Sequence, residues 1–172
     1  VEKENFSPGE LIEEKKKPGV LWVHLDGLRD IGRLEEIGRI FGLHPLILED
    51  ILNTDQRPKA EDFTDYIFIV LKNIHHPAGQ NLHAEQISIL LGPNFVLSFQ
   101  EKAGTLFDPI RERIRTDKGR IRKAGADYLA HHLMDAIVDQ YFAVLEDIDD
   151  KIELLEEDLV KKTTPDKLQA IH

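Results

Sequence analysis

One long stretch of the chain, from about Ala126 to Val160, contains neither proline nor glycine, the residues that break helices. Its apolar residues recur every three or four positions, which is the spacing of one face of an α-helix. A helix of about 35 residues spans roughly 50 Å, because each residue adds about 1.5 Å. Helices in globular proteins average about a third of that length. We therefore expect this helix to project as an arm from the domain that precedes it.

The apolar positions within this predicted helix repeat with a period of 11 residues. They are spaced by 4, 4, 3, 4, 4, 3 and 4 residues and comprise Leu133, Ile137, Tyr141, Val144, Ile148, Ile152, Leu155 and Leu159. This period predicts a nearly straight or slightly right-handed helix rather than a heptad coiled coil. Beyond it, Thr164 and Pro165 predict a break followed by the first turn of another helix. We therefore interpret the chain as ending just as a further element begins.

The part of the chain before the arm alternates between strand-like and helix-like patterns. The predicted strands are 20–27, 66–74, 83–91 and 95–101, the last two joined by a hairpin turn at GPN. The predicted helices are 31–41, which ends at Gly42, the segment that begins at Pro45, and 105–116. We expect residues 1–19 to be a frayed start and 57–65 to be a connector. This order predicts an α/β fold, a mixed β-sheet layered with helices and followed by the long projecting arm.

Composition places the chain among soluble globular proteins and excludes several functional classes. Its 172 residues carry a net charge of -10 and include no cysteine. The acidic balance argues against a nucleic-acid partner, since such binding requires lysine and arginine at phosphates. Without cysteine the chain has no thiolate metal site and no thiol nucleophile. The longest apolar run, YIFIVL, is far shorter than the roughly 18 residues of a membrane span, and the first residues lack the apolar centre of a signal peptide.

Several stretches together resemble the cytosolic domain of CorA-type magnesium transporters. They are WVHLDG, HPLILEDILNTDQRPKAEDFTDYIFIVLK, EQISILL, FVLSFQEK, FDPIRERIR and ADYLAHHLMDAIVDQYF, and the likeness extends over residues 21–160. In that family the cytosolic domain builds a homopentamer. A long stalk helix connects it to two membrane helices, with a Gly-Met-Asn tripeptide at the pore mouth. This chain contains neither the membrane helices nor the tripeptide.

The resemblance implies a regulatory module of an ion transporter rather than an enzyme. It implies a soluble piece at the cytoplasmic face of the cell membrane, joined to the membrane only through C-terminal helices, with Mg²⁺ or another divalent cation such as Co²⁺ as its ligand. It also divides the chain into a polar segment, an α/β sheet domain, a helical part with a long acidic arm, and the start of a stalk helix: 1–19, 20–104, 105–163 and 164–172. Because selectivity resides in the pore, a related zinc or cobalt/nickel transporter stays an alternative.

An adjacent acid pair lies within the apolar segment HPLILEDILN, residues 44–53. At about 100° per residue the other apolar side chains share one side of the predicted helix, and Glu49 and Asp50 lie on the opposite side with Leu46. Adjacent carboxylates diverge on a helix, so the pair needs a partner on another surface to hold an ion. Spacing alone favours an ordinary solvated acidic face. The resemblance instead implies an inter-subunit divalent-cation site at this pair, completed by carboxylates from the stalk of the next subunit.

Further acids lie on the predicted arm. Asp135 matches a family acid close to the inter-subunit site, and Asp139 one turn later is a competing candidate. The resemblance therefore implies Glu49, Asp50 and Asp135 as metal ligands. Such oxygen ligands favour hard cations such as Mg²⁺. Residues 146–158 hold eight acids, which form either a solvated helix face or a region that gathers cations.

The histidines are the basis of an alternative from another class, a soluble metal-dependent protein. His75, His76 and His83 cluster around a predicted loop, and His131 and His132 are adjacent on the arm. A zinc-hydrolase site needs three converging ligands and an open position, whereas adjacent histidines are expected to point apart. We therefore predict no native catalytic site, although soft metals such as Co²⁺ can bind there adventitiously. A third alternative is a scaffold that binds no functional metal.

Overall fold

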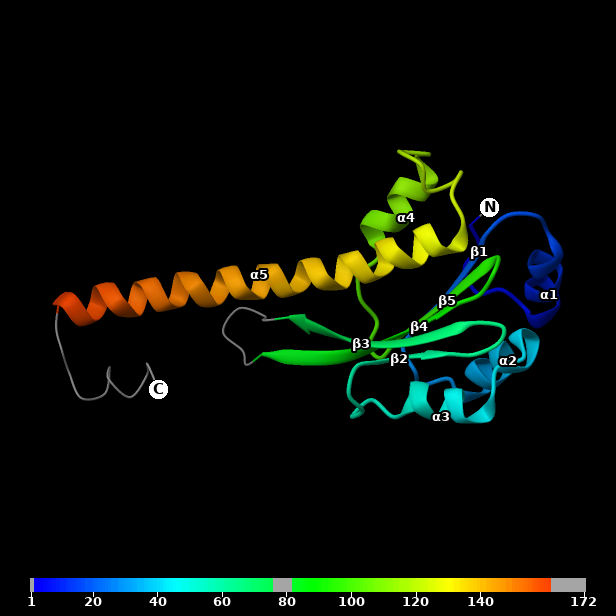
Figure 1. Cartoon of the computed structure of the whole chain (residues 1–172), viewed down its shortest axis with the longest axis horizontal. Coiled ribbons are helices and arrows are strands. Elements are labelled where there is room, and N and C mark those ends of the chain that lie inside the picture. Colours follow the sequence, from blue (N-terminus) through cyan, green and yellow to red (C-terminus); the bar gives the residue numbers. More distant parts are fainter. Residues whose placement is uncertain (1, 76–81, 162–172) are drawn as a thin grey trace.

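The computed structural model describes residues 2–75 and 82–161, with side chains up to 157 in the last helix. A five-stranded sheet of order β1-β5-β4-β3-β2 forms its centre (Figure 1). Its strands are β1 (Leu21–Asp26), β2 (Lys59–Asp62), β3 (Ile67–His75), β4 (His83–Leu91) and β5 (Phe95–Gln100). The helices are α1 (Pro8–Lys16), α2 (Ile31–Phe41), α3 (Pro45–Leu52), α4 (Asp108–Arg115) and α5 (Ala126–Lys161). The predicted mixed α/β fold is confirmed.

The sheet is mixed because its first strand, β1, lies at one edge and runs parallel to its neighbour β5. β1 pairs with β5 in parallel, with Leu21 opposite Phe95, and the other neighbouring strands are antiparallel. The predicted hairpin between β4 and β5 is present, and the backbone N–H of Gly92 donates to the carbonyl of Phe95 at 2.9 Å. β5 is buried along its whole length. Helices on both faces of the sheet explain that burial.

Two hydrophobic cores lie on opposite faces of the sheet. Alternate residues of each strand point to opposite faces, so Phe68 and Leu97 pack with α2 and α3, whereas Ile87 and Val96 pack with α5. Figure 1 shows the same separation, with α2 and α3 on one side of the strands and α5 on the other. Residues on α3 and on α5 are therefore separated by the sheet.

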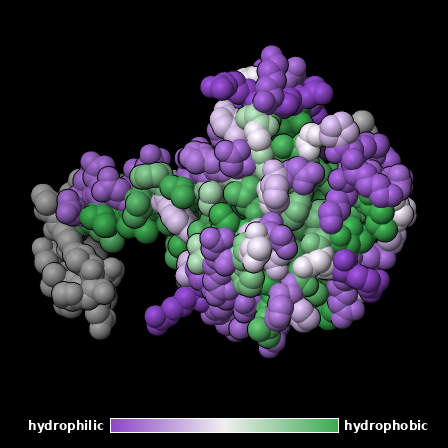
Figure 2. Space-filling view, turned by 45° about the vertical axis from the view of Figure 1, so that its right-hand side comes forward, coloured by the Kyte–Doolittle hydropathy of each residue, from purple (hydrophilic) through white to green (hydrophobic). Residues whose placement is uncertain are grey.

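The long helix is confirmed, and it is 36 residues long. Its first half is anchored on the sheet, where Leu133 and Ile137 are fully buried and the Tyr141 hydroxyl donates to the carbonyl of Lys72. Farther along, large apolar side chains are exposed on the projecting arm (Figure 2): Phe142, Leu145, Ile148, Ile152 and Leu154. No helix in the described ranges is both long and apolar enough to cross a membrane.

Two sequence predictions were wrong. Residues 1–19 are not merely a frayed start, because α1 forms there with a capping box between Ser7 and Glu10, and its Leu11 is buried. The expected connector 57–65 contains β2, whose sequence KAED carries charges that are typical of an edge strand. The predicted break at Thr164 and Pro165 lies outside the described residues.

The hairpin turn leaves no room for a side chain at Gly92. A Cβ atom there would lie 2.3 Å from ring atoms of Phe95, a buried residue whose ring packs 4.8 Å from that of Phe41. We predict that Gly92→Ala lowers the free energy of unfolding by about 1 to 3 kcal/mol, measured by urea denaturation. Gly9→Ala is the matched control, since nothing lies within 4 Å of its Cβ position and it begins a helix. A Gly92→Ala protein as stable as the control would contradict this close packing.

Candidate divalent-cation sites

The acid pair lies on α3, a short helix fixed to the sheet by its apolar side. His44 caps the helix, its ring accepting a hydrogen bond from the N–H of Leu46 at 3.2 Å. Ile47 and Ile51 are buried, whereas Glu49 is exposed and Asp50 is partly exposed. The predicted division into apolar and acidic sides is confirmed at these positions, whereas Leu52 at the end of the helix is exposed.

Asp50 already has a cationic partner within the chain. The Lys59 Nζ lies 2.7 Å from Asp50 Oδ2 and 3.0 Å from Glu61 Oε1. The hydrogen bond to Asp50 is the main reason that the pKa of Lys59 is raised. In this structure the ammonium group of Lys59 is therefore bound to one of the two carboxylate oxygens of Asp50.

The main chain beneath the acid pair is held from inside the protein. The buried Gln86 of β4 donates from Nε2 to the carbonyls of Asp50 and Ile51, at 3.1 and 3.2 Å. Gln56 also donates to the Asp50 carbonyl. These bonds satisfy carbonyl groups at the end of α3 that have no partner within the helix. The sequence analysis did not identify Gln86, although a glutamine among the apolar residues of β4 was a visible signal.

Asp135 does not join the acid pair within one chain. It is exposed on α5, and α5 packs on the face of the sheet opposite to α3. Glu49 and Asp50 therefore form one acidic surface and Asp135 belongs to another (Figure 1). The three predicted ligands therefore do not come together within one chain.

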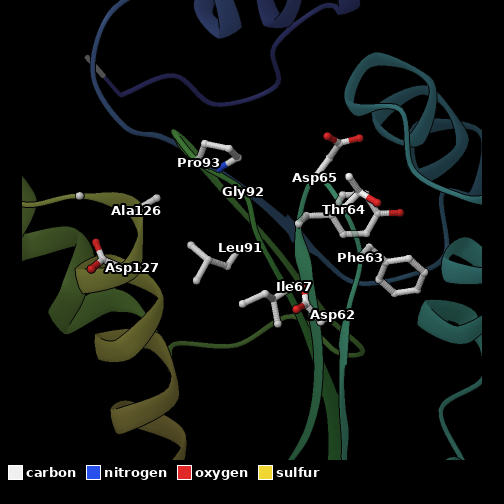
Figure 3. Close-up of a pocket in the computed structure, with 12 residues that line it drawn as sticks. Asp62, Phe63, Thr64, Asp65, Ile67, Leu91, Gly92, Pro93, Ala126 and Asp127 are labelled. Atoms are coloured by element: carbon white, nitrogen blue, oxygen red, sulfur yellow. The ribbon is translucent and has the colours of Figure 1, made fainter.

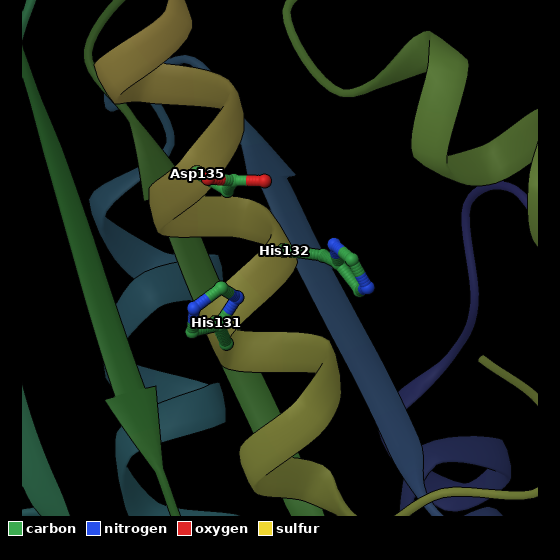
Figure 4. Close-up of side chains that lie close together, drawn as sticks. All are labelled: His131, His132 and Asp135. Carbon is green, nitrogen blue, oxygen red and sulfur yellow. The ribbon is translucent and has the colours of Figure 1, made fainter. Parts of the chain in front are cut away.

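Asp135 instead lies beside two histidines of its own helix. One ring nitrogen of His131, one of His132 and a carboxylate oxygen of Asp135 lie within 4.8 Å of one another. Figure 4 shows the Asp135 side chain one turn beyond His131, with the ring of His132 beside them. The ring planes of His131 and His132 are perpendicular, with centroids 5.8 Å apart. The expectation that these adjacent histidines point apart was therefore wrong.

The electrostatic surroundings of His132 favour its neutral form. Burial lowers the pKa of His132, and the positive charges of Arg113 and His131 act in the same direction, whereas Asp135 opposes them. Tyr128 packs against the ring edge to face, with centroids 4.4 Å apart. This contact with Tyr128 holds the imidazole in its orientation.

The other predicted histidine cluster is not a three-ligand site in the part of the chain that the structure describes. The rings of His75 and His83 stack with centroids 5.9 Å apart, and His76 lies outside the described residues. Glu85 is buried nearby, but its carboxylate accepts hydrogen bonds from Asn73 at 2.7 Å and Gln100 at 3.2 Å. These contacts do not support a catalytic metal site at this loop.

A shallow depression lies where two turns approach the start of α5. It has a volume of about 350 Å³ and is lined by residues 62–67, 91–93 and 125–127. Figure 3 shows Asp127 on the opposite wall from Asp62 and Asp65. Because these carboxylates do not converge on one point, the depression is not a cation site in this conformation.

Comparison with known proteins identifies the family. Residues 17–172 match the family described as CorA-like Mg²⁺ transporter protein. The chain belongs to this family. The cobalt/magnesium transport protein CorA of Thermotoga maritima is 49% identical over 154 residues, which is 88% of this chain and 43% of that protein. The CorA-like chain thus spans less than half the length of this relative.

Solved CorA structures share the fold. The soluble domain of CorA from Methanocaldococcus jannaschii matches with a TM-score of 0.69 at 20% identity, over 87% of this chain and 59% of that one. The complete CorA magnesium transporter from the same organism matches with a TM-score of 0.74 at 18% identity, over 99% and 51% of the two chains. The CorA-like chain therefore has the fold of the soluble part of these transporters, and its named relatives are transporters rather than enzymes.

Proposed function

We propose that this chain is the cation-sensing regulatory domain of a CorA-like Mg²⁺ transporter at the cytoplasmic face of the membrane. The observation that carries the proposal is the acid pair on α3, whose acidic side is exposed together with a Leu46 that is 60% exposed. Exposed leucine beside carboxylates is suited to a surface that a neighbouring subunit covers. The family membership supports Mg²⁺ as the ligand, with Co²⁺ as a second one.

The proposed mechanism uses Mg²⁺ as a bridge between subunits of a homopentamer. Glu49 and Asp50 supply oxygen ligands from one subunit, and acids on the next subunit complete the site. Asp135 does not reach the acid pair within its own chain. In the proposed mechanism it therefore contributes to the bridge from a separate surface of the subunit. At high Mg²⁺ the ion offsets the repulsion between these carboxylates and favours the closed ring. When Mg²⁺ falls, the bridges are lost and the population shifts toward the open state.

The decisive experiment measures inhibition of ion uptake by cytosolic Mg²⁺ in the full-length protein. Asp50→Ala is expected to conduct at Mg²⁺ concentrations that close the wild type, because one bridging ligand is missing. Asp55→Ala is the matched control, since it removes the same charge from an exposed position just beyond α3. Unchanged Mg²⁺ inhibition in Asp50→Ala would contradict the proposal. Uptake of Mg²⁺, Co²⁺, Ni²⁺ and Zn²⁺ by the same preparation identifies the transported ion.

Lys59 sets the Mg²⁺ concentration at which this sensor responds, because its ammonium group competes with Mg²⁺ for Asp50. We predict that Lys59→Met shifts Mg²⁺ inhibition to lower concentration. Removal of a partly exposed ion pair is worth about 1 kcal/mol, or about a fivefold change in Mg²⁺ affinity. Arg57→Met is the control, as it removes a positive charge from an exposed neighbouring position. A shift of equal size in both variants would indicate a general charge effect rather than competition.

A further inference from the structure

We propose that His131, His132 and Asp135 form a second cation site, held within a single subunit and selective for transition metals such as Co²⁺, Ni²⁺ and Zn²⁺ over Mg²⁺. The three side chains lie on one stretch of α5, and their ligand atoms are within 4.8 Å of one another. The site needs no second subunit. Asp135 is shared with the proposed sensor, whereas His131 and His132 are not, so the double histidine variant separates the two sites.

The spacing of the three ligands suits closure around one ion. His131 and Asp135 are four residues apart and lie on the same side of α5, one turn from each other (Figure 4). Metal bonds of about 2.1 Å place tetrahedral ligand atoms about 3.4 Å apart. The ligand atoms therefore have to approach by only about 1 Å, which small rotations within side-chain rotamer wells provide. His131 and Asp135 are exposed, which favours this movement.

His132 is the fixed member of the set. Its ring is half-buried and packs against Tyr128. Its Nε2 is buried and has no hydrogen-bond partner. A ring held in this orientation keeps one of its nitrogens within 4.8 Å of the ligand atoms of His131 and Asp135. The two exposed ligands close onto this imidazole, and water fills the remaining positions.

The ligand types determine which ions bind. Two imidazole nitrogens and one carboxylate suit Co²⁺, Ni²⁺ and Zn²⁺, whereas Mg²⁺ prefers an all-oxygen shell and gives up its waters reluctantly. The Irving–Williams order places Ni²⁺ above Co²⁺ at such a site. The acid pair on α3 has only oxygen ligands, so the two faces of the sheet favour different ions. Arg113, whose charge acts on His132, opposes cation binding and limits its affinity.

The test is a metal titration of this chain, purified without a histidine tag and treated with a chelator. Co²⁺ binding is followed by visible absorption and Ni²⁺ binding by calorimetry, in a large excess of Mg²⁺. We expect one ion per chain, and a loss of affinity of at least about 10-fold in the His131→Gln/His132→Gln double variant and in Asp135→Asn. Circular dichroism checks that these variants fold.

The matched control is His75→Gln/His83→Gln, which removes the other pair of neighbouring imidazoles. It is expected to retain wild-type affinity. If this control loses Co²⁺ binding while the α5 variants retain it, the metal is bound at the β3–β4 end and the inference is wrong. Displacement of Co²⁺ by Mg²⁺, or one ion shared by two chains, would also overturn it.

Discussion

Replacing Leu133 with alanine is expected to lower the free energy of unfolding by about 3 kcal/mol, because large-to-small changes in a core cost about 2 to 5 kcal/mol. Leu133 is fully buried between α5 and the sheet, in the core that also contains Ile89 and Val96. Alanine would leave a cavity where the arm is anchored. Urea denaturation of the isolated chain measures the loss.

The matched control on the same helix is Leu145→Ala. Leu145 is 60% exposed on the projecting part of α5. Its truncation is expected to change the free energy of unfolding by less than about 0.5 kcal/mol. Similar losses in the free energy of unfolding in both variants would mean that the second half of α5 also contributes to the anchoring of the helix. The contrast between the two variants therefore tests how far along α5 the helix packs against the sheet.

A second large effect on stability is expected from His24. Lowering the pH should destabilise the protein, because this histidine is buried in its neutral form. The His24 side chain is 8% exposed, its Nδ1 lies 2.8 Å from Ser98 Oγ, and Phe107 covers the ring edge to face. Trp22 Nε1 donates to the same hydroxyl at 2.8 Å, so this hydroxyl can donate its own proton to Nδ1. A protonated ring could not accept that bond.

The pKa of His24 is lowered to about 4, mainly by burial and then by Arg111, while Asp26 and Asp108 oppose the shift. The unfolded chain therefore binds a proton near pH 6.5, whereas the folded chain stays unprotonated down to about pH 4. Stability contributed by the neutral ring is complete above pH 6.5 and declines as the pH falls through this window. The loss amounts to about 3 kcal/mol, at 1.36 kcal/mol per pKa unit.

Urea denaturation at pH 7 and pH 4 compares wild type with His24→Gln. The variant should lose about 3 kcal/mol less than wild type over this interval. His83→Gln, which changes an exposed histidine at the start of β4, is the matched control. An NMR titration of His24 provides the direct value, and a folded-state pKa near 6.5 would contradict the account.

Much of the fold could be predicted because local signals were strong. The arm has an uninterrupted helical period, and β3 to β5 are apolar runs bounded by turn residues. The missed elements had weaker apolar patterns. In α1 only Leu11 is buried, so its capping box was the available signal. β2 has charged residues at a sheet edge, and its pairing with β3 depends on the rest of the sheet.

The chemistry of the candidate sites was only partly predictable. The helical period alone was enough to predict that Glu49 and Asp50 lie on the other side of α3 from their apolar neighbours. Lys59 and Gln86 reach Asp50 from 9 and 36 residues away, and only tertiary packing brings them there. The approach of His131 and His132 depends on side-chain rotamers, which the sequence does not specify.

The central claim is that Mg²⁺ joins the acidic side of α3 to a neighbouring subunit. Amide hydrogen exchange of residues 44–53 in the full-length assembled protein tests it most directly, since exchange reports local opening of this helix. We predict slower exchange at high Mg²⁺ than without Mg²⁺ in the wild type, and no such difference in Asp50→Ala. Exchange that is independent of Mg²⁺ in the wild type would contradict the account.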